Sequence, residues 1–208
     1  MLRVLFSLDA AARPYAEEII KKSRFVGRLR QVESEQAFAA FLAEVREIER
    51  GARHHCYAYV IGEDEESRIE RFSDDGEPGG TAGAPMLAAL HGRGLVNVAA
   101  VVSRYYGGVN LGAGGLVRAY SGTVIAALET ADLRPRVRAQ LFRLQVEHGT
   151  AGWVEAELRR RGVEVIGVGY GERAVITVAS TEPDGLQTAV AEITSGGAEL
   201  VPVGHVWR

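Results

Sequence analysis

The first half of the chain alternates between strand-like and helix-like hydrophobic patterns. Apolar residues in 34–50 recur at three- and four-residue steps, which predicts an amphipathic helix with one face toward a core. Residues 14–31 predict a strand pair before that helix. Residues 54–61 and 67–72 are rich in β-forming residues and predict a second pair after it.

The most apolar run of the chain, residues 95–103, is dominated by valine and predicts a strand buried on both faces at the centre of a sheet. A helix over residues 85–91 is expected before it. After a glycine-rich turn we expect a second helix, lined on one side by apolar residues between 116 and 128. These elements predict a βα sandwich in residues 1–134.

A different order of elements follows in residues 138–208. Strand-like alternation begins near residue 138, and the later segments predict a helix, two strands, a helix and a final strand. The order βαββαβ is that of a ferredoxin-like domain. We therefore predict an α+β protein of two domains, with Arg134, Pro135 and Arg136 as the linker.

Composition limits the classes of partner. The chain has 208 residues and a formal net charge of −3, divided into −1 for residues 1–137 and −2 for the rest. Neither part is a general polyanion binder, so any contact with nucleic acid needs a local patch. No apolar run approaches the roughly 20 residues that span a bilayer, and the first nine residues lack the order of a signal peptide. We expect a cytoplasmic protein without a membrane partner.

Five cations near residues 21–30 form a candidate basic patch. On a strand, Lys22, Arg24, Arg28 and Arg30 have the same parity and share one face. A solvated strand face with no ligand is the alternative interpretation.

Metal and cysteine chemistry have little support. His54 and His55 are adjacent on a predicted strand, so they point to opposite faces and do not suit one metal ion; we expect one to be buried and hydrogen-bonded and the other free. Cys56 is the single cysteine, which excludes an intramolecular disulfide and favours a plain buried thiol. We predict neither a metal nor a cofactor.

Two polar segments carry the remaining candidates. Asp74, Asp75 and Glu77 are close enough in sequence to hold a divalent cation or to act as acid and base. Alternatively, they cap a turn and pair with a cation such as Arg104. The glycine-rich turn of residues 107–115 lies between a strand and a helix, an arrangement that presents backbone N–H groups to an anion.

The polar segments together resemble a known family. Residues 22–25, 54–58, 73–78, 80–83 and 104–120 are similar, in order, to the IMPACT (YigZ) family. The resemblance implies a first domain like domain four of elongation factor G and a ferredoxin-like second domain. Its eukaryotic members regulate translation through a protein partner. One departure is Gly79, where the family usually has serine, and this disfavours a serine-based enzyme.

Two hypotheses follow. The first is a non-enzymatic RNA- or ribosome-associated module linked to translation regulation, with cations beside aromatic rings that stack on bases. The second is a site for the phosphate of a nucleotide or small molecule, which includes the possibility of an enzyme. A third, neutral interpretation is that the tyrosines and glycines only pack. The candidate binding residues are Lys22, Arg24, His54, His55, Asp74, Asp75, Glu77, Arg104, Tyr105, Tyr106, Gly107, Gly108, Gly112, Gly114, Gly115 and Arg118.

Overall fold

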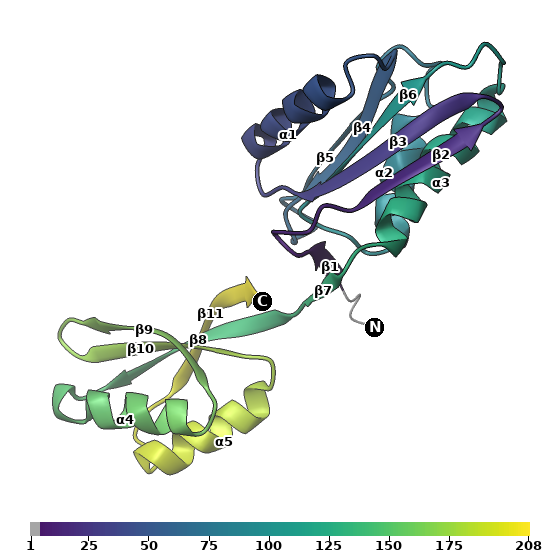
Figure 1. The fold of residues 1–208 in the computed structure, drawn as a ribbon. Helices are drawn as coiled ribbons and strands as arrows, with labels where there is room; N and C mark the ends of the chain where they lie inside the picture. The colour runs from purple at the N-terminus through teal and green to yellow at the C-terminus, as the bar shows by residue number, and fades with distance from the viewer. Residues whose placement is uncertain (1–4) are drawn as a thin grey trace. The chain divides into compact units, whose positions relative to one another are not determined.

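The computed structural model describes residues 5–208 and divides the chain into two compact units. The first unit ends at Arg136 and the second is Val137–Arg208. Figure 1 shows an α+β architecture in each unit, with a sheet and its own helices.

The first unit is built on an antiparallel five-stranded sheet in the order β2-β3-β6-β4-β5. The central strand β6 is buried along almost its whole length, which confirms the prediction from its valine-rich sequence. The strands are β2 (Tyr15–Ile20), β3 (Ser23–Gln31), β4 (His54–Ile61), β5 (Ile69–Ser73) and β6 (Val98–Tyr105).

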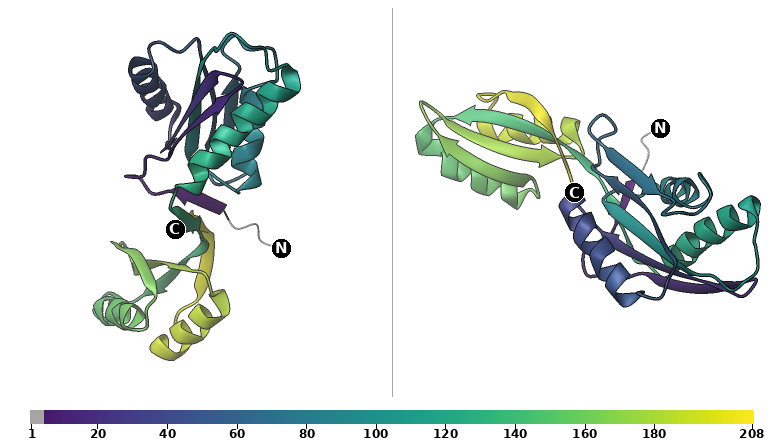
Figure 2. Two further views of the ribbon diagram at one scale, coloured as in Figure 1. Left: turned by 45° about the vertical axis from the view of Figure 1, so that its right-hand side comes forward. Right: turned by 90° about the horizontal axis from the view of Figure 1, so that it is seen from above.

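Helices cover both faces of this sheet (Figures 1 and 2). Helix α1 (Glu35–Ile48) lies on one face, where Phe38, Phe41 and Val45 enter a core with residues of β4 and β6. Helices α2 (Gly83–Gly92) and α3 (Ala113–Glu129) lie on the other face. A Cβ at Gly27 would meet Thr123 Cγ2 at 2.7 Å, so glycine at this position of β3 permits the close approach of α3.

The predicted linker is a strand. Residues Leu133–Arg136 form β7, which pairs with β1 (Leu5–Leu8) in a separate antiparallel ribbon. Both strands of a two-stranded ribbon are edges, and an edge strand tolerates the missing N–H of Pro135. The Arg-Pro-Arg sequence predicted a linker, but pairing with β1 makes this segment a strand.

The second unit has the predicted ferredoxin-like topology. Its sheet order is β11-β8-β10-β9, all antiparallel, with α4 and α5 on one face (Figure 1). Phe142, Leu144 and Val146 alternate into the core with both helices, as their spacing predicted. The elements are β8 (Arg138–Val146), α4 (His148–Arg160), β9 (Glu164–Tyr170), β10 (Ala174–Ser180), α5 (Pro183–Thr194) and β11 (Leu200–Trp207).

Among residues 5–208, no helix is long and apolar enough to cross a membrane.

Candidate functional site

A cleft of about 480 Å³ lies at one end of the first unit's sheet. It is formed where β4 begins and β6 ends, together with the loop after β5 and the turn before α3. We call it the α3 cleft. Its lining residues include Arg53, His54, Glu77, Arg104, Tyr106, Asn110, Gly112 and Ala113.

Arg104 and Glu77 form a buried ion pair on the wall of the α3 cleft. Arg104 Nη1 donates to both carboxylate oxygens of Glu77, at 2.7 and 3.0 Å, and the two side chains are only 6% and 4% exposed. Tyr120 Oη donates to Glu77 Oε1 at 2.7 Å, and burial raises the pKa of that hydroxyl. The sequence-based alternative in which the acidic loop pairs with Arg104 is confirmed for Glu77, and Arg104 is a buried group rather than a surface charge.

The other two acidic residues of the loop have different partners. Asp74 accepts hydrogen bonds from the backbone N–H groups of residues 80, 82 and 83, at the start of α2. Burial acts to raise the pKa of Asp74, but these donors outweigh it and the pKa is lowered. Asp75 accepts from the His55 N–H at 2.7 Å. Among the described residues, no three His, Cys, Asp or Glu side chains are grouped to hold a metal ion.

His54, His55 and Cys56 alternate across β4 as predicted, but neither histidine is free. His54 Nδ1 bonds the Asp75 carbonyl at 2.7 Å on one face, and His55 Nδ1 bonds Ser103 Oγ at 2.9 Å on the other. Burial lowers the pKa of His55. Burial raises the pKa of the Cys56 thiol to about 12, so this cysteine is a poor nucleophile.

The glycine-rich turn connects β6 to a helix without a side-chain cap. Gly112 precedes α3 with φ of 72°, and the first turn of α3 contains no acidic residue. Gly107 is required by packing, because a Cβ there would lie 2.0 Å from the Lys22 carbonyl oxygen. This contact places the β2–β3 turn beside the turn that leads to α3.

Most of the predicted basic strand face is neutralised by carboxylates. Arg28 pairs with Glu49 at 2.7 Å. Arg30 pairs with Glu44 at 2.5 Å. Arg24, paired with Glu17, also lies over the Tyr105 ring at 4.0 Å from its centroid. This network favours the alternative of a solvated, internally paired strand face.

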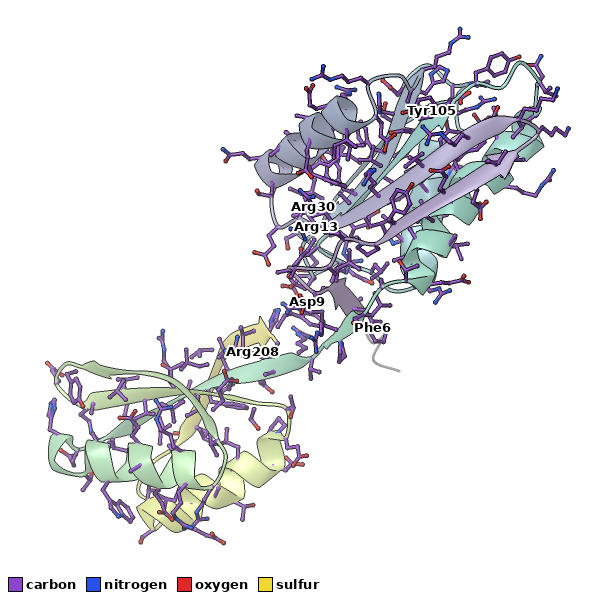
Figure 3. The ribbon with its side chains drawn as sticks, in the orientation of Figure 1. Phe6, Asp9, Arg13, Arg30, Tyr105 and Arg208 are labelled. Carbon is purple, nitrogen blue, oxygen red and sulfur yellow. The ribbon has the colours of Figure 1, made fainter. Side chains whose placement is uncertain are left out.

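The two tyrosines at the end of β6 differ in exposure. Tyr105 is partly buried and its hydroxyl donates to Glu49 at 2.8 Å, whereas Tyr106 is 44% exposed and lines the α3 cleft. Figure 3 shows Tyr105 at the opposite end of the sheet from Arg30. Two of the cations predicted beside the tyrosines contact their rings: Arg24 lies over Tyr105, and Arg104 lies over Tyr106 at 5.4 Å from its centroid.

Several exposed cations near the α3 cleft have no ion pair within residues 5–208, among them Lys22, Arg53 and Arg118. Lys22 is in the β2–β3 turn rather than on the strand, with φ of 67°. Arg118 Nη1 would lie 3.6 Å from a Cβ at Gly114, so its guanidinium extends back over the first turn of α3. Our sequence-based selection missed Arg53, although it directly precedes His54.

Comparisons with known proteins identify both parts of the chain. Residues 21–128 match the Impact N-terminal domain, and residues 144–196 match a domain of unknown function, DUF1949. The IMPACT family member YigZ of Escherichia coli is 39% identical over 198 residues, which cover 94% of this chain and 97% of YigZ. YvyE of Bacillus subtilis is 35% identical over 202 residues, covering 96% and 91% of the two chains.

A solved structure, described as the crystal structure of a hypothetical protein, has the same two-domain fold. It is 36% identical, covers 98% of each chain and gives a TM-score of 0.72. Together with the match of the first domain, these relatives show that the chain belongs to the IMPACT family.

Proposed function

We propose that this protein is a non-enzymatic RNA- or ribosome-associated module linked to translation regulation, and that it binds RNA through the rim of the α3 cleft. The observation that carries the proposal is a set of exposed cations without a carboxylate partner among the described residues near the exposed ring of Tyr106. Arg53 lines the α3 cleft with Tyr106, Lys22 lies in the turn beside Gly107, and Arg118 extends over the first turn of α3. The link to translation comes from the family resemblance, in which eukaryotic members regulate translation through a protein partner.

Electrostatics and stacking support this surface. A cation that replaces the counterion of a phosphate adds affinity that falls as salt rises. An exposed aromatic ring stacks on any base and contributes about 1–3 kcal/mol per stacked base. The rim of the cleft offers both kinds of contact, whereas the paired arginines of β3 have their charges neutralised by carboxylates.

Binding of the full chain to ribosomes, transfer RNA and short single-stranded RNA across a salt series tests the proposal. The informative variant is Lys22→Glu combined with Arg118→Glu, because both side chains are exposed and reversal leaves the buried pair of Arg104 intact. We expect weaker binding and a salt slope reduced by about 0.7 for each lost phosphate contact with a single strand.

Arg13→Glu is the control, and it reverses one charge where the double variant reverses two. Arg13 is exposed and lies at the other end of the same unit from Tyr105 in Figure 3. The control has the same sign of charge change at a site away from the cleft, so it should retain most of the affinity. Equal losses in the control and in the double variant would indicate only a nonspecific charge effect and would contradict the proposal, as would the absence of binding at low salt.

The second candidate function is a phosphate site for a nucleotide or small molecule. The uncapped start of α3 supports its phosphate-binding half. Its other half, a divalent cation held by the acidic loop, is not supported, because Asp74, Asp75 and Glu77 each bond a different group.

A further inference from the structure

The α3 cleft contains two features that lack a partner. Helix α3 is 17 residues long, and its first intrahelical bond is from the Leu116 N–H to the Gly112 carbonyl. The N–H groups of Ala113, Gly114 and Gly115 precede that bond, and no side chain among the described residues caps them. A Cβ at Gly112 would meet no atom within 4 Å, so the space beside this backbone is open.

Arg104 supplies the second, independent feature. It lines the same cleft and is only 5% exposed, yet its Nε has no hydrogen-bond partner in the described part of the chain. A buried donor without a partner costs about 1–3 kcal/mol, more for a charged group. The other two helices of this unit differ, because Ser34 caps α1 and Asp74 caps α2.

The charge of the cleft favours an anion. Two arginines, Arg53 and Arg104, and one carboxylate, Glu77, line it. The start of α3 adds the equivalent of about half a positive charge. A cleft of about 480 Å³ is also within the range of small-molecule sites.

We propose that the α3 cleft binds a terminal phosphate group, a phosphate monoester, on the free N–H groups that open α3 and beside Arg104. A terminal phosphate has three unesterified oxygens, one for each N–H of Ala113, Gly114 and Gly115. The inference rests on the proposed function, because an RNA bound at the rim would place its terminal phosphate in the cleft. Two sources carry this group: the 5′ end of an RNA and a free nucleoside monophosphate.

Inorganic phosphate is the first probe, and its binding is monitored through the amide NMR shifts of the full chain. Saturable shifts at Gly112, Gly114 and Gly115 are expected at millimolar phosphate. Shifts that are absent there, or that spread evenly over both units, would overturn the inference.

The decisive variant is Ala113→Glu, with Ala113→Gln as its isosteric control. A carboxylate in the first turn complements the helix dipole, so Ala113→Glu should keep or slightly raise the stability of the protein. It should nevertheless abolish the phosphate shifts, whereas Ala113→Gln retains them. Retained binding in Ala113→Glu would count against the site. Because this variant keeps its stability, a loss of phosphate binding cannot be attributed to unfolding.

Two oligonucleotide arms identify the source. A single-stranded RNA with a 5′-phosphate should bind at least about tenfold tighter than the same RNA with a 5′-hydroxyl, and Ala113→Glu should remove the difference. If a nucleoside 5′-monophosphate alone matches the phosphorylated RNA, the ligand is the free nucleotide. If both RNAs bind equally and lose affinity in the Lys22→Glu, Arg118→Glu variant, the phosphate inference fails while the proposed function stands.

Discussion

Arg104 and Glu77 are joined by two hydrogen bonds from one guanidinium nitrogen, and both side chains are almost fully buried. Tyr120 from α3 holds the same carboxylate, so the pair ties β6 and the loop after β5 to the helix. Both charges are removed from water, and each depends on the other to offset the cost of burial.

Removing either partner of this pair should be strongly destabilising. We expect Glu77→Ala or Arg104→Ala to lower the free energy of unfolding by about 3–5 kcal/mol, because the remaining charge is left buried and unpaired. Urea unfolding followed by circular dichroism measures the change. Arg50→Ala is the control, since its pair with Glu47 on α1 is largely exposed and should contribute less than about 1 kcal/mol. A loss of stability in Arg50→Ala as large as that in Glu77→Ala or Arg104→Ala would contradict the importance of burial.

The fold could be predicted from the sequence to a large extent, because its periodic segments are strong. The valine run of β6 and the alternation of β8 predict which residues are buried from the local sequence pattern alone. The β1–β7 ribbon could not be predicted, since it joins residues more than 120 positions apart and each strand has only four residues. Short strands of this kind depend on tertiary pairing more than on local pattern.

The sequence singled out several residues that the structure brings together at the α3 cleft, but their individual contacts could not be predicted. Sequence spacing brought Arg104 near the acidic loop, yet it did not show which of three carboxylates it contacts. The even spacing of Lys22 and Arg24 predicted that both lie on one strand face. Lys22 is in a turn at positive φ, and residue spacing alone does not reveal such a turn. Neutralisation of Arg28 by Glu49 depends on the docking of α1, a long-range contact.

Asp74 should contribute stability that depends on pH. Its two oxygens accept three backbone N–H groups, so Asp74→Asn, which has one acceptor oxygen, should lower the free energy of unfolding at pH 7 by about 2 kcal/mol. Folding lowers the pKa of Asp74 below 3.8. The contribution is therefore complete above about pH 3.8 and is lost as pH falls through the folded-state pKa.

Unfolding curves of wild type and Asp74→Asn between pH 7 and pH 3 check this dependence, and the difference in stability between the two should shrink as pH falls below about 3.8. Glu66→Gln, an exposed position in the loop between β4 and β5, controls for the removal of one negative charge. A difference between wild type and Asp74→Asn that stays constant down to pH 3 would exclude the linkage.

Cys56 should be unreactive in the folded protein. Burial raises the pKa of its thiol to about 12, and the side chain has no exposed surface. A thiol reagent at pH 8 should modify the native chain only through unfolding, while the denatured chain reacts at once. Since the chain has one cysteine, the rate reports a single site. Rapid modification of the native protein would show that the β4 core opens locally.

Gly107 should be far less replaceable than Gly79, although both lie in glycine-rich loops. A Cβ at Gly107 would be 2.0 and 2.1 Å from backbone atoms of Lys22, so Gly107→Ala must displace the β2–β3 turn and should cost about 1–3 kcal/mol. A Cβ at Gly79 would meet nothing within 4 Å. Gly79→Ser, which introduces the family's usual residue, should change stability by less than about 0.5 kcal/mol.

RNA binding should separate the same two variants. Displacement of the β2–β3 turn moves Lys22 away from the rim of the α3 cleft, so Gly107→Ala should bind RNA more weakly even at temperatures where it remains folded. Gly79→Ser should bind like wild type, because its side chain extends into open space. Undiminished RNA affinity in folded Gly107→Ala would mean that the position of Lys22 does not matter for binding, and the rim would then have to act through Arg53 and Arg118 alone.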